Sequence, residues 1–113
     1  MGKKIFLLLL FSAFLLNAHP PKSIELNYDA QTGALSVRVL HKVNDPEEHF
    51  ILRIEVRSGK ELLAEKTYER QESASGQNEV FLFVDKPLAK GTAVTVTARC
   101  NISGKKSADL VWE

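Results

Sequence analysis

Hydrophobic and polar residues alternate one by one along several short stretches that follow residue 22. A period of two residues is typical of a β-strand with one face on a hydrophobic core. The positions that we expect on the buried faces of the first three strands are Ile24, Leu26, Tyr28, Leu35, Val37, Val39, Phe50, Leu52, Ile54 and Val56. The second row continues in phase to His41, so this side chain is expected to point inward.

The second half of the chain predicts further strands of differing character. Residues 61–68 have a weaker, charged pattern that suits an edge strand. Residues 69–77 are polar and predict a mobile loop, whereas residues 80–84 are apolar on both faces and predict a central strand. A last strand is expected over residues 108–112. The strand before it places four residues on one face, namely Val94, Val96, Ala98 and Cys100.

No stretch has a convincing helical period. About seven short strands, spaced by about ten residues and separated by turn-forming residues, predict an immunoglobulin-like antiparallel β-sandwich, an all-β fold. The pair of cysteines that crosses the core of antibody domains is absent. Because sandwiches carry many unrelated functions, the function has to be argued from a site.

The first 18 residues have the layout of a secretory signal peptide. Lys3 and Lys4 precede an apolar run over residues 5–16, and the small residue Ala18 ends the segment. The run is too short to span a bilayer comfortably. We therefore predict a signal peptide over residues 1–18, a single domain over residues 19–113, and a secreted or periplasmic protein without stable membrane insertion.

The charge of the chain excludes some classes of partner. The formal net charge is +1, and removal of Lys3 and Lys4 brings the domain close to neutrality. A neutral domain without a basic patch gives no reason to expect binding to nucleic acid. The oligomeric state cannot be inferred from the sequence.

The chain has one cysteine and three histidines, all at predicted strand ends or loop edges. Cys100 ends a strand at the turn 101–104, His41 and His49 bracket one loop, and His19 follows the predicted cleavage site. Imidazole and thiolate groups suit iron, zinc or copper. The sequence therefore predicts a metal site. If cleavage follows Ala18, the amine of His19 becomes a further donor.

Each of these residues also has a structural interpretation. A lone cysteine in a strand is often a small buried hydrophobe. His19 would then belong to a frayed terminus, and His41 and His49 would hydrogen-bond the acidic loop between them. Residues 101–103 also match the short N-glycosylation pattern.

The order of these residues resembles the iron-binding domain of superoxide reductases, also called the desulfoferrodoxin ferrous iron-binding domain. The resemblance covers most of residues 19–113. The segments that carry it are His41, His49-Phe50-Ile51, Ile54-Glu55-Val56 and Cys100-Asn101-Ile102-Ser103-Gly104.

The resemblance implies a mononuclear, non-haem iron held by four histidines in a plane and by a cysteine thiolate, with one position open to superoxide. An outside donor would supply the electrons that reduce superoxide to peroxide. His19, His41, His49 and Cys100 match four of the five ligands. Ser103 stands where the family has its remaining histidine, and Asn17 and Ala18 replace the family's Glu-Lys pair.

The sequence thus predicts an exported superoxide reductase-like protein with metal ligands His19, His41, His49 and Cys100. Iron is the expected metal, with zinc or copper as alternatives. The rival hypothesis is a non-catalytic metal-binding or metal-carrying module, or an interaction domain with a vestigial site. A blue-copper site is excluded because no closely spaced His and Met follow Cys100, and no nucleophile elbow indicates a hydrolase.

Overall fold

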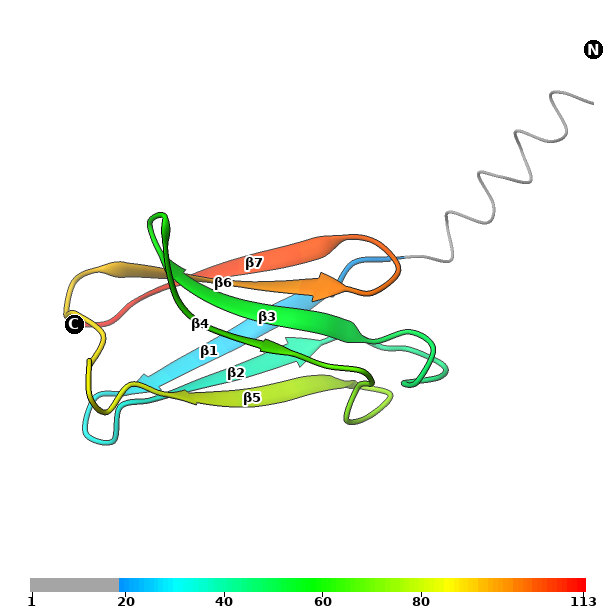
Figure 1. The fold of residues 1–113 in the computed structure, drawn as a ribbon, viewed down its shortest axis with the longest axis horizontal. Helices are drawn as coiled ribbons and strands as arrows, with labels where there is room; N and C mark the ends of the chain where they lie inside the picture. The colour runs from blue at the N-terminus through cyan, green and yellow to red at the C-terminus, as the bar shows by residue number, and fades with distance from the viewer. Residues whose placement is uncertain (1–18) are drawn as a thin grey trace, which may run out of the picture.

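The computed structural model describes residues 19–113, which form a sandwich of two antiparallel sheets (Figure 1). One sheet has the strand order β1-β2-β5 and the other the order β4-β3-β6-β7. The strands are β1 Ser23–Asp29, β2 Ala34–Leu40, β3 Ile51–Ser58, β4 Glu61–Thr67, β5 Gly76–Leu82, β6 Ala93–Cys100 and β7 Lys105–Val111. The all-β sandwich is as predicted, and the predicted signal peptide lies outside the described residues. Within residues 19–113, no helix is long and apolar enough to cross a membrane.

The alternating pattern produces the hydrophobic core between the two sheets, to which β2, β3 and β6 contribute most of the fully buried side chains. Leu35, Val37 and Val39 are buried on β2, and Val94, Val96, Ala98 and Cys100 are buried on β6. His41 continues the buried row of β2 and is 1% exposed. The inward direction predicted for His41 and Cys100 is therefore confirmed.

The predicted phase of β3 is wrong at its beginning. Ile51 is fully buried, whereas Leu52, which was expected in the core, is 38% exposed. The register of the β3–β6 ladder shifts between Ile51 and Arg53, so the strand changes phase before it reaches Ile54. Such an irregularity reverses the side chains that precede it, and alternation alone does not reveal it.

Two predictions about the strand around residue 80 are also wrong. β5 lies at the edge of its sheet rather than in the centre, and Val80 and Leu82 are exposed on its outer face. In contrast, the edge position predicted for residues 61–68 is confirmed by β4.

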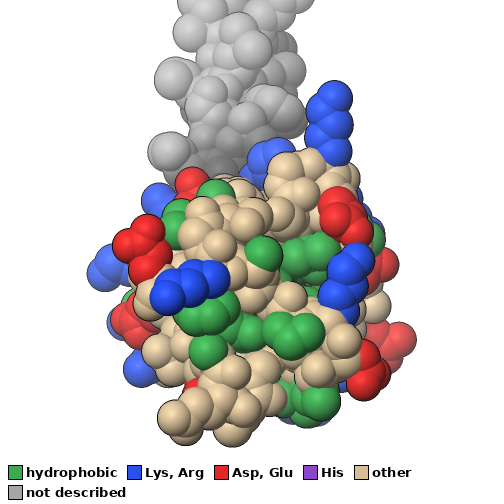
Figure 2. Space-filling model, turned by 90° about the vertical axis from the view of Figure 1, so that its left-hand side faces the viewer, with side chains coloured by type: hydrophobic (Ala, Val, Ile, Leu, Met, Phe, Trp, Pro, Cys, Tyr) green, Lys and Arg blue, Asp and Glu red, His purple; other side chains and the backbone are tan. Residues whose placement is uncertain are grey.

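The two ends of the sandwich differ. The ends of β2 and β6 and the beginning of β3 meet at one end (Figure 1). At the opposite end, hydrophobic side chains are exposed between charged ones (Figure 2). At that end, the ring centroids of Tyr28 and Trp112 lie 5.4 Å apart, and Trp112 Nε1 donates a hydrogen bond to the Leu88 carbonyl at 3.1 Å. His41, which follows β2, His49, which precedes β3, and Cys100, the last residue of β6, lie at the first end.

Candidate metal centre

His41 follows the last residue of β2 and is held on both its backbone and its ring. Its backbone N–H donates to the Ser75 carbonyl at 2.9 Å, and its Nδ1 lies 2.9 Å from Gln71 Oε1. The other ring nitrogen, Nε2, is buried and has no hydrogen-bond partner in the described part of the chain. A buried polar atom without a partner is costly, so this nitrogen is suited to bind a metal ion.

Gln71 is a component of the site that the sequence prediction missed. It belongs to the segment predicted to be a mobile loop, yet its side chain is fully buried. It contacts His41 and donates from Nε2 to the carbonyls of His41 and Ser73, both at 2.8 Å. A glutamine among polar residues has no pattern that distinguishes it, so no signal in the sequence could have found it.

His49 lies in the loop between β2 and β3, and hydrogen bonds within this loop hold its conformation. The Asp45 carbonyl accepts from the backbone N–H of His49 at 2.9 Å, and the Asp45 side chain accepts from the N–H of Glu47 at 3.0 Å. His49 Nε2 lies 3.0 Å from Cys100 Sγ. Burial lowers the pKa of the His49 imidazole, and the neighbouring His41 and His19 lower it further. The neutral imidazole, the form that binds metals, is therefore favoured.

Cys100 ends β6 and is 3% exposed. Its Sγ lies 3.5 Å from the backbone N–H of Ile102, which is oriented to donate to it. The next residue, Asn101, ties this turn to the loop of His49: its Oδ1 accepts from the Phe50 N–H at 2.8 Å, and its Nδ2 donates to the Glu48 carbonyl at 3.1 Å. The side-chain nitrogen of the possible glycosylation site is thus already in use in the folded chain.

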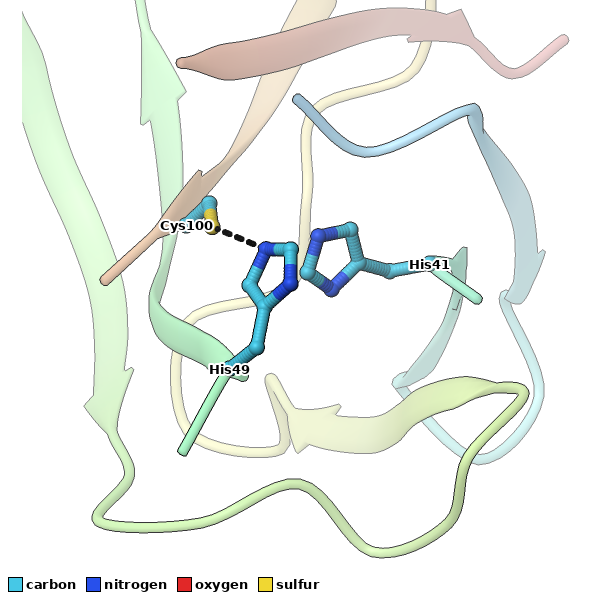
Figure 3. Close-up of side chains that lie close together, drawn as sticks. All are labelled: His41, His49 and Cys100. Atoms are coloured by element: carbon cyan, nitrogen blue, oxygen red, sulfur yellow. Dashed lines mark hydrogen bonds between the residues drawn. The ribbon is translucent and has the colours of Figure 1, made fainter. Parts of the chain in front are cut away.

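His41, His49 and Cys100 converge on one point between the two sheets (Figure 3). One donor atom from each lies within 4.8 Å of the other two. A transition metal that binds nitrogen at about 2.0 Å and sulfur at about 2.3 Å separates its ligand atoms by about 3–4 Å. The three donors are therefore close to the spacing that a single ion requires, and their N and S chemistry fits iron, zinc or copper.

His19 lies beside this group without being part of its compact core. Its ring centroid is 5.3 Å from that of His41 and 5.1 Å from that of His49. The segment reaches the site by packing on the turn between β6 and β7, where a Cβ on Gly104 would stand 2.7 Å from the Cβ of Pro20. Ser103, at the position of the missing histidine, is exposed on that turn.

A hollow of about 830 Å³ opens beside the three histidines. His19, His41 and His49 line it together with Lys22 and Lys42, and no acidic residue in the described part of the chain does. Both lysine side chains are exposed to solvent. The hollow is therefore suited to a small anion.

Comparisons with known proteins agree on the fold. The superoxide reductase (1Fe-SOR) from Giardia intestinalis is 17% identical, with a TM-score of 0.56 over 82% of this chain and 99% of that chain. The superoxide reductase (neelaredoxin) from Ignicoccus hospitalis is 19% identical, with a TM-score of 0.53 over 84% of this chain and 81% of that chain. No family model and no curated protein matches the chain. The chain thus has the fold of these superoxide reductases and, within it, a possible metal site of His41, His49 and Cys100.

Proposed function

We propose that this protein is an exported, superoxide reductase-like metalloprotein that binds one iron ion through His41, His49, Cys100 and His19. Its proposed activity is the reduction of superoxide to peroxide with electrons from an outside donor. The observation that carries the proposal is the buried Nε2 of His41, which has no hydrogen-bond partner among residues 19–113 and lies beside the His49–Cys100 pair. A purely structural histidine at this position would be expected to have a partner on both nitrogens.

The residues of the chain have separate roles in this proposal. His41 and His49 offer ring nitrogens, and Cys100 offers a sulfur that accepts from the N–H of Ile102. Lys22 and Lys42 place positive charge around the hollow and attract an anionic substrate. A bound ferrous ion would supply one electron to superoxide, two protons would complete hydrogen peroxide, and the external donor would restore the ferrous state.

A second candidate function is the binding or transport of a metal without turnover. It is favoured by the exposure of Ser103 and by the position of His19 outside the compact group of three donors. A site with fewer imidazoles than the family's iron centre would also suit zinc or copper. A free amine on His19, created by cleavage after Ala18, would add a nitrogen donor and bring the number of nitrogen ligands closer to that of the family's iron centre.

The export part of the proposal is based on the sequence of residues 1–18 alone. Mass spectrometry of the protein from its native host would identify the mature N-terminus. A terminus at His19 supports export and the amine ligand together, and retention of Met1 would contradict both.

Metal analysis of the purified protein, followed by its absorption spectrum, tests the function. One iron per chain, with a thiolate-to-iron band in the oxidised protein that bleaches on reduction and returns with superoxide, supports the reductase. One zinc or copper per chain supports the carrier. Absence of any metal after incubation with all three would refute both.

A further inference from the structure

Gln71 makes an unusual set of contacts for a loop residue. Its fully buried side chain lies among groups that frame the candidate metal centre: the ring and carbonyl of His41, the N–H of Ile51 and the carbonyl of Ser73. The loop between β4 and β5 therefore inserts one amide between the end of β2 and the beginning of β3.

The backbone alone determines which way this amide faces. The Ile51 N–H, 3.1 Å away, requires an acceptor and therefore faces Oε1. The His41 and Ser73 carbonyls, each 2.8 Å away, require a donor and therefore face Nε2. In a flipped amide, the NH₂ group would face the N–H of Ile51 and the oxygen would face the two carbonyls. Only one orientation therefore satisfies all three backbone groups.

The orientation of the amide in turn determines the protonation of His41. Because Oε1 is only an acceptor, the Nδ1 that lies 2.9 Å from it must carry the hydrogen. A neutral imidazole has one hydrogen, so Nε2 is left with a free lone pair, and this is the nitrogen that has no partner within the described segment 19–113.

We propose that Gln71 is a positioning residue that holds His41 in the Nδ1–H tautomer and thereby presents the Nε2 lone pair to a bound metal ion. Histidine ligands commonly donate their second N–H to an oxygen in this way. The proposal rests on the proposed function for the presence of the metal, whereas the tautomer is a property of the metal-free protein.

Gln71 also links His41 to the other two ligands. Its Oε1 accepts from the N–H of Ile51, which follows the His49-Phe50 segment and is paired with Cys100 in the β3–β6 ladder. One side chain therefore determines both the orientation of His41 and its distance from the strand pair that carries His49 and Cys100.

The test compares Gln71→Met with Gln77→Met. Gln77 is a matched control because it is also buried and its Oε1 also accepts from a backbone N–H, that of Glu72, but its side-chain hydrogen bonds go to Glu72 and Asn78 rather than to a histidine. Nitrogen-15 NMR of the metal-free full chain at mildly alkaline pH reports which ring nitrogen of His41 carries the hydrogen. Cobalt(II), whose thiolate band reports Cys100, serves as the affinity probe.

We expect hydrogen on Nδ1 of His41 in the parent and in Gln77→Met, and a mixture of tautomers in Gln71→Met. Cobalt(II) affinity should fall about 10–100-fold in Gln71→Met only. Gln71→Glu, which keeps an acceptor at this place, should retain the parent tautomer. Hydrogen on Nε2 in the parent, or equal tautomers and affinities in Gln71→Met and Gln77→Met, would overturn the proposal.

Two failures remain distinguishable. A parent that binds no cobalt(II) or other metal refutes the proposed function, whereas its NMR spectrum still decides the role of Gln71. If Gln71→Met does not fold, hydrogen on Nε2 of His41 in the parent would still overturn the proposal, because the proposal requires Nδ1–H there.

Discussion

His49 Nε2 and Cys100 Sγ lie 3.0 Å apart, although the two residues are 51 positions apart in the sequence. The contact joins the loop before β3 to the end of β6, and Asn101 reinforces it from the side. A site built from separated segments in this way depends on the register between β3 and β6, which makes several consequences measurable.

Replacing Cys100 by Ser should abolish thiolate ligation. Because a hydroxyl is a much weaker ligand for transition metals than a thiolate, metal affinity should fall by two orders of magnitude or more. Val96→Ala is the control, since Val96 is a fully buried residue of the same strand that offers no donor atom. It should lower stability and retain the metal. Equal affinities for the parent and Cys100→Ser would show that the thiolate is not a ligand.

Replacing Asn101 by Ala removes both hydrogen bonds between the Cys100 turn and the His49 loop. We expect a loss of about 1–3 kcal/mol in the free energy of unfolding, because the Phe50 N–H and the Glu48 carbonyl lose their partner. Metal affinity should fall as well. Asn101→Asp keeps the acceptor for Phe50 and should be affected less. Denaturant unfolding measures both variants, and identical losses would contradict separate roles for the two hydrogen bonds.

Gly104 permits the segment that carries His19 to pack on the β6–β7 turn. At φ +86°, with Pro20 in the way of a Cβ, Gly104→Ala is expected to displace that segment. Gly59→Ala is a matched control, since its φ is +59° but nothing lies within 4 Å of the added Cβ. Both variants should lose roughly 1–2 kcal/mol for the left-handed backbone.

Of these two glycine variants, only Gly104→Ala should also weaken metal binding. The loss of affinity should match that of His19→Ala. An unchanged affinity in Gly104→Ala and His19→Ala would remove His19 from the ligand set.

Tyr68 donates to Glu79 Oε1 at 2.6 Å and thereby joins the segment after β4 to β5. Burial, followed by the hydrogen bond to Glu79 and its charge, raises the pKa of Tyr68. A raised folded-state pKa stabilises the fold at pH values below the unfolded pKa of about 10, and this contribution is lost as the pH rises above it. The parent should therefore lose stability above about pH 10 more steeply than Tyr68→Phe. Denaturant unfolding from about pH 9 to about pH 11, roughly one unit on either side of the ordinary tyrosine pKa, measures the free energy of unfolding of both proteins. Equal dependence on pH in the parent and in Tyr68→Phe would contradict this prediction.

The parts of the site that could be predicted are those that follow from strand alternation. His41 continues the buried row of β2 and Cys100 that of β6, so their inward direction could be read from a period of two. The role of Gln71 could not be predicted from the sequence. Its side chain is buried because backbone N–H and carbonyl groups of other segments hydrogen-bond to its amide. The pattern does not reveal the exposed face of β5, because Val80 and Leu82 on that face are as apolar as core residues.

The phase of β3 gives the sharpest test of the structure against simple alternation. Alternation predicts that Leu52 packs in the core and that Ile51 is exposed, whereas the structure has Ile51 fully buried and opposite Cys100. Ile51→Ala should therefore cost about 2–5 kcal/mol, and Leu52→Ala less than about 1 kcal/mol, in the free energy of unfolding. Because the Ile51 side chain is fully buried beside the strand position of Cys100, the cavity left by Ile51→Ala should loosen the metal site, while Leu52→Ala leaves it intact. Denaturant unfolding and metal titration of the two variants measure both effects, and a larger loss for Leu52→Ala would place the register shift elsewhere.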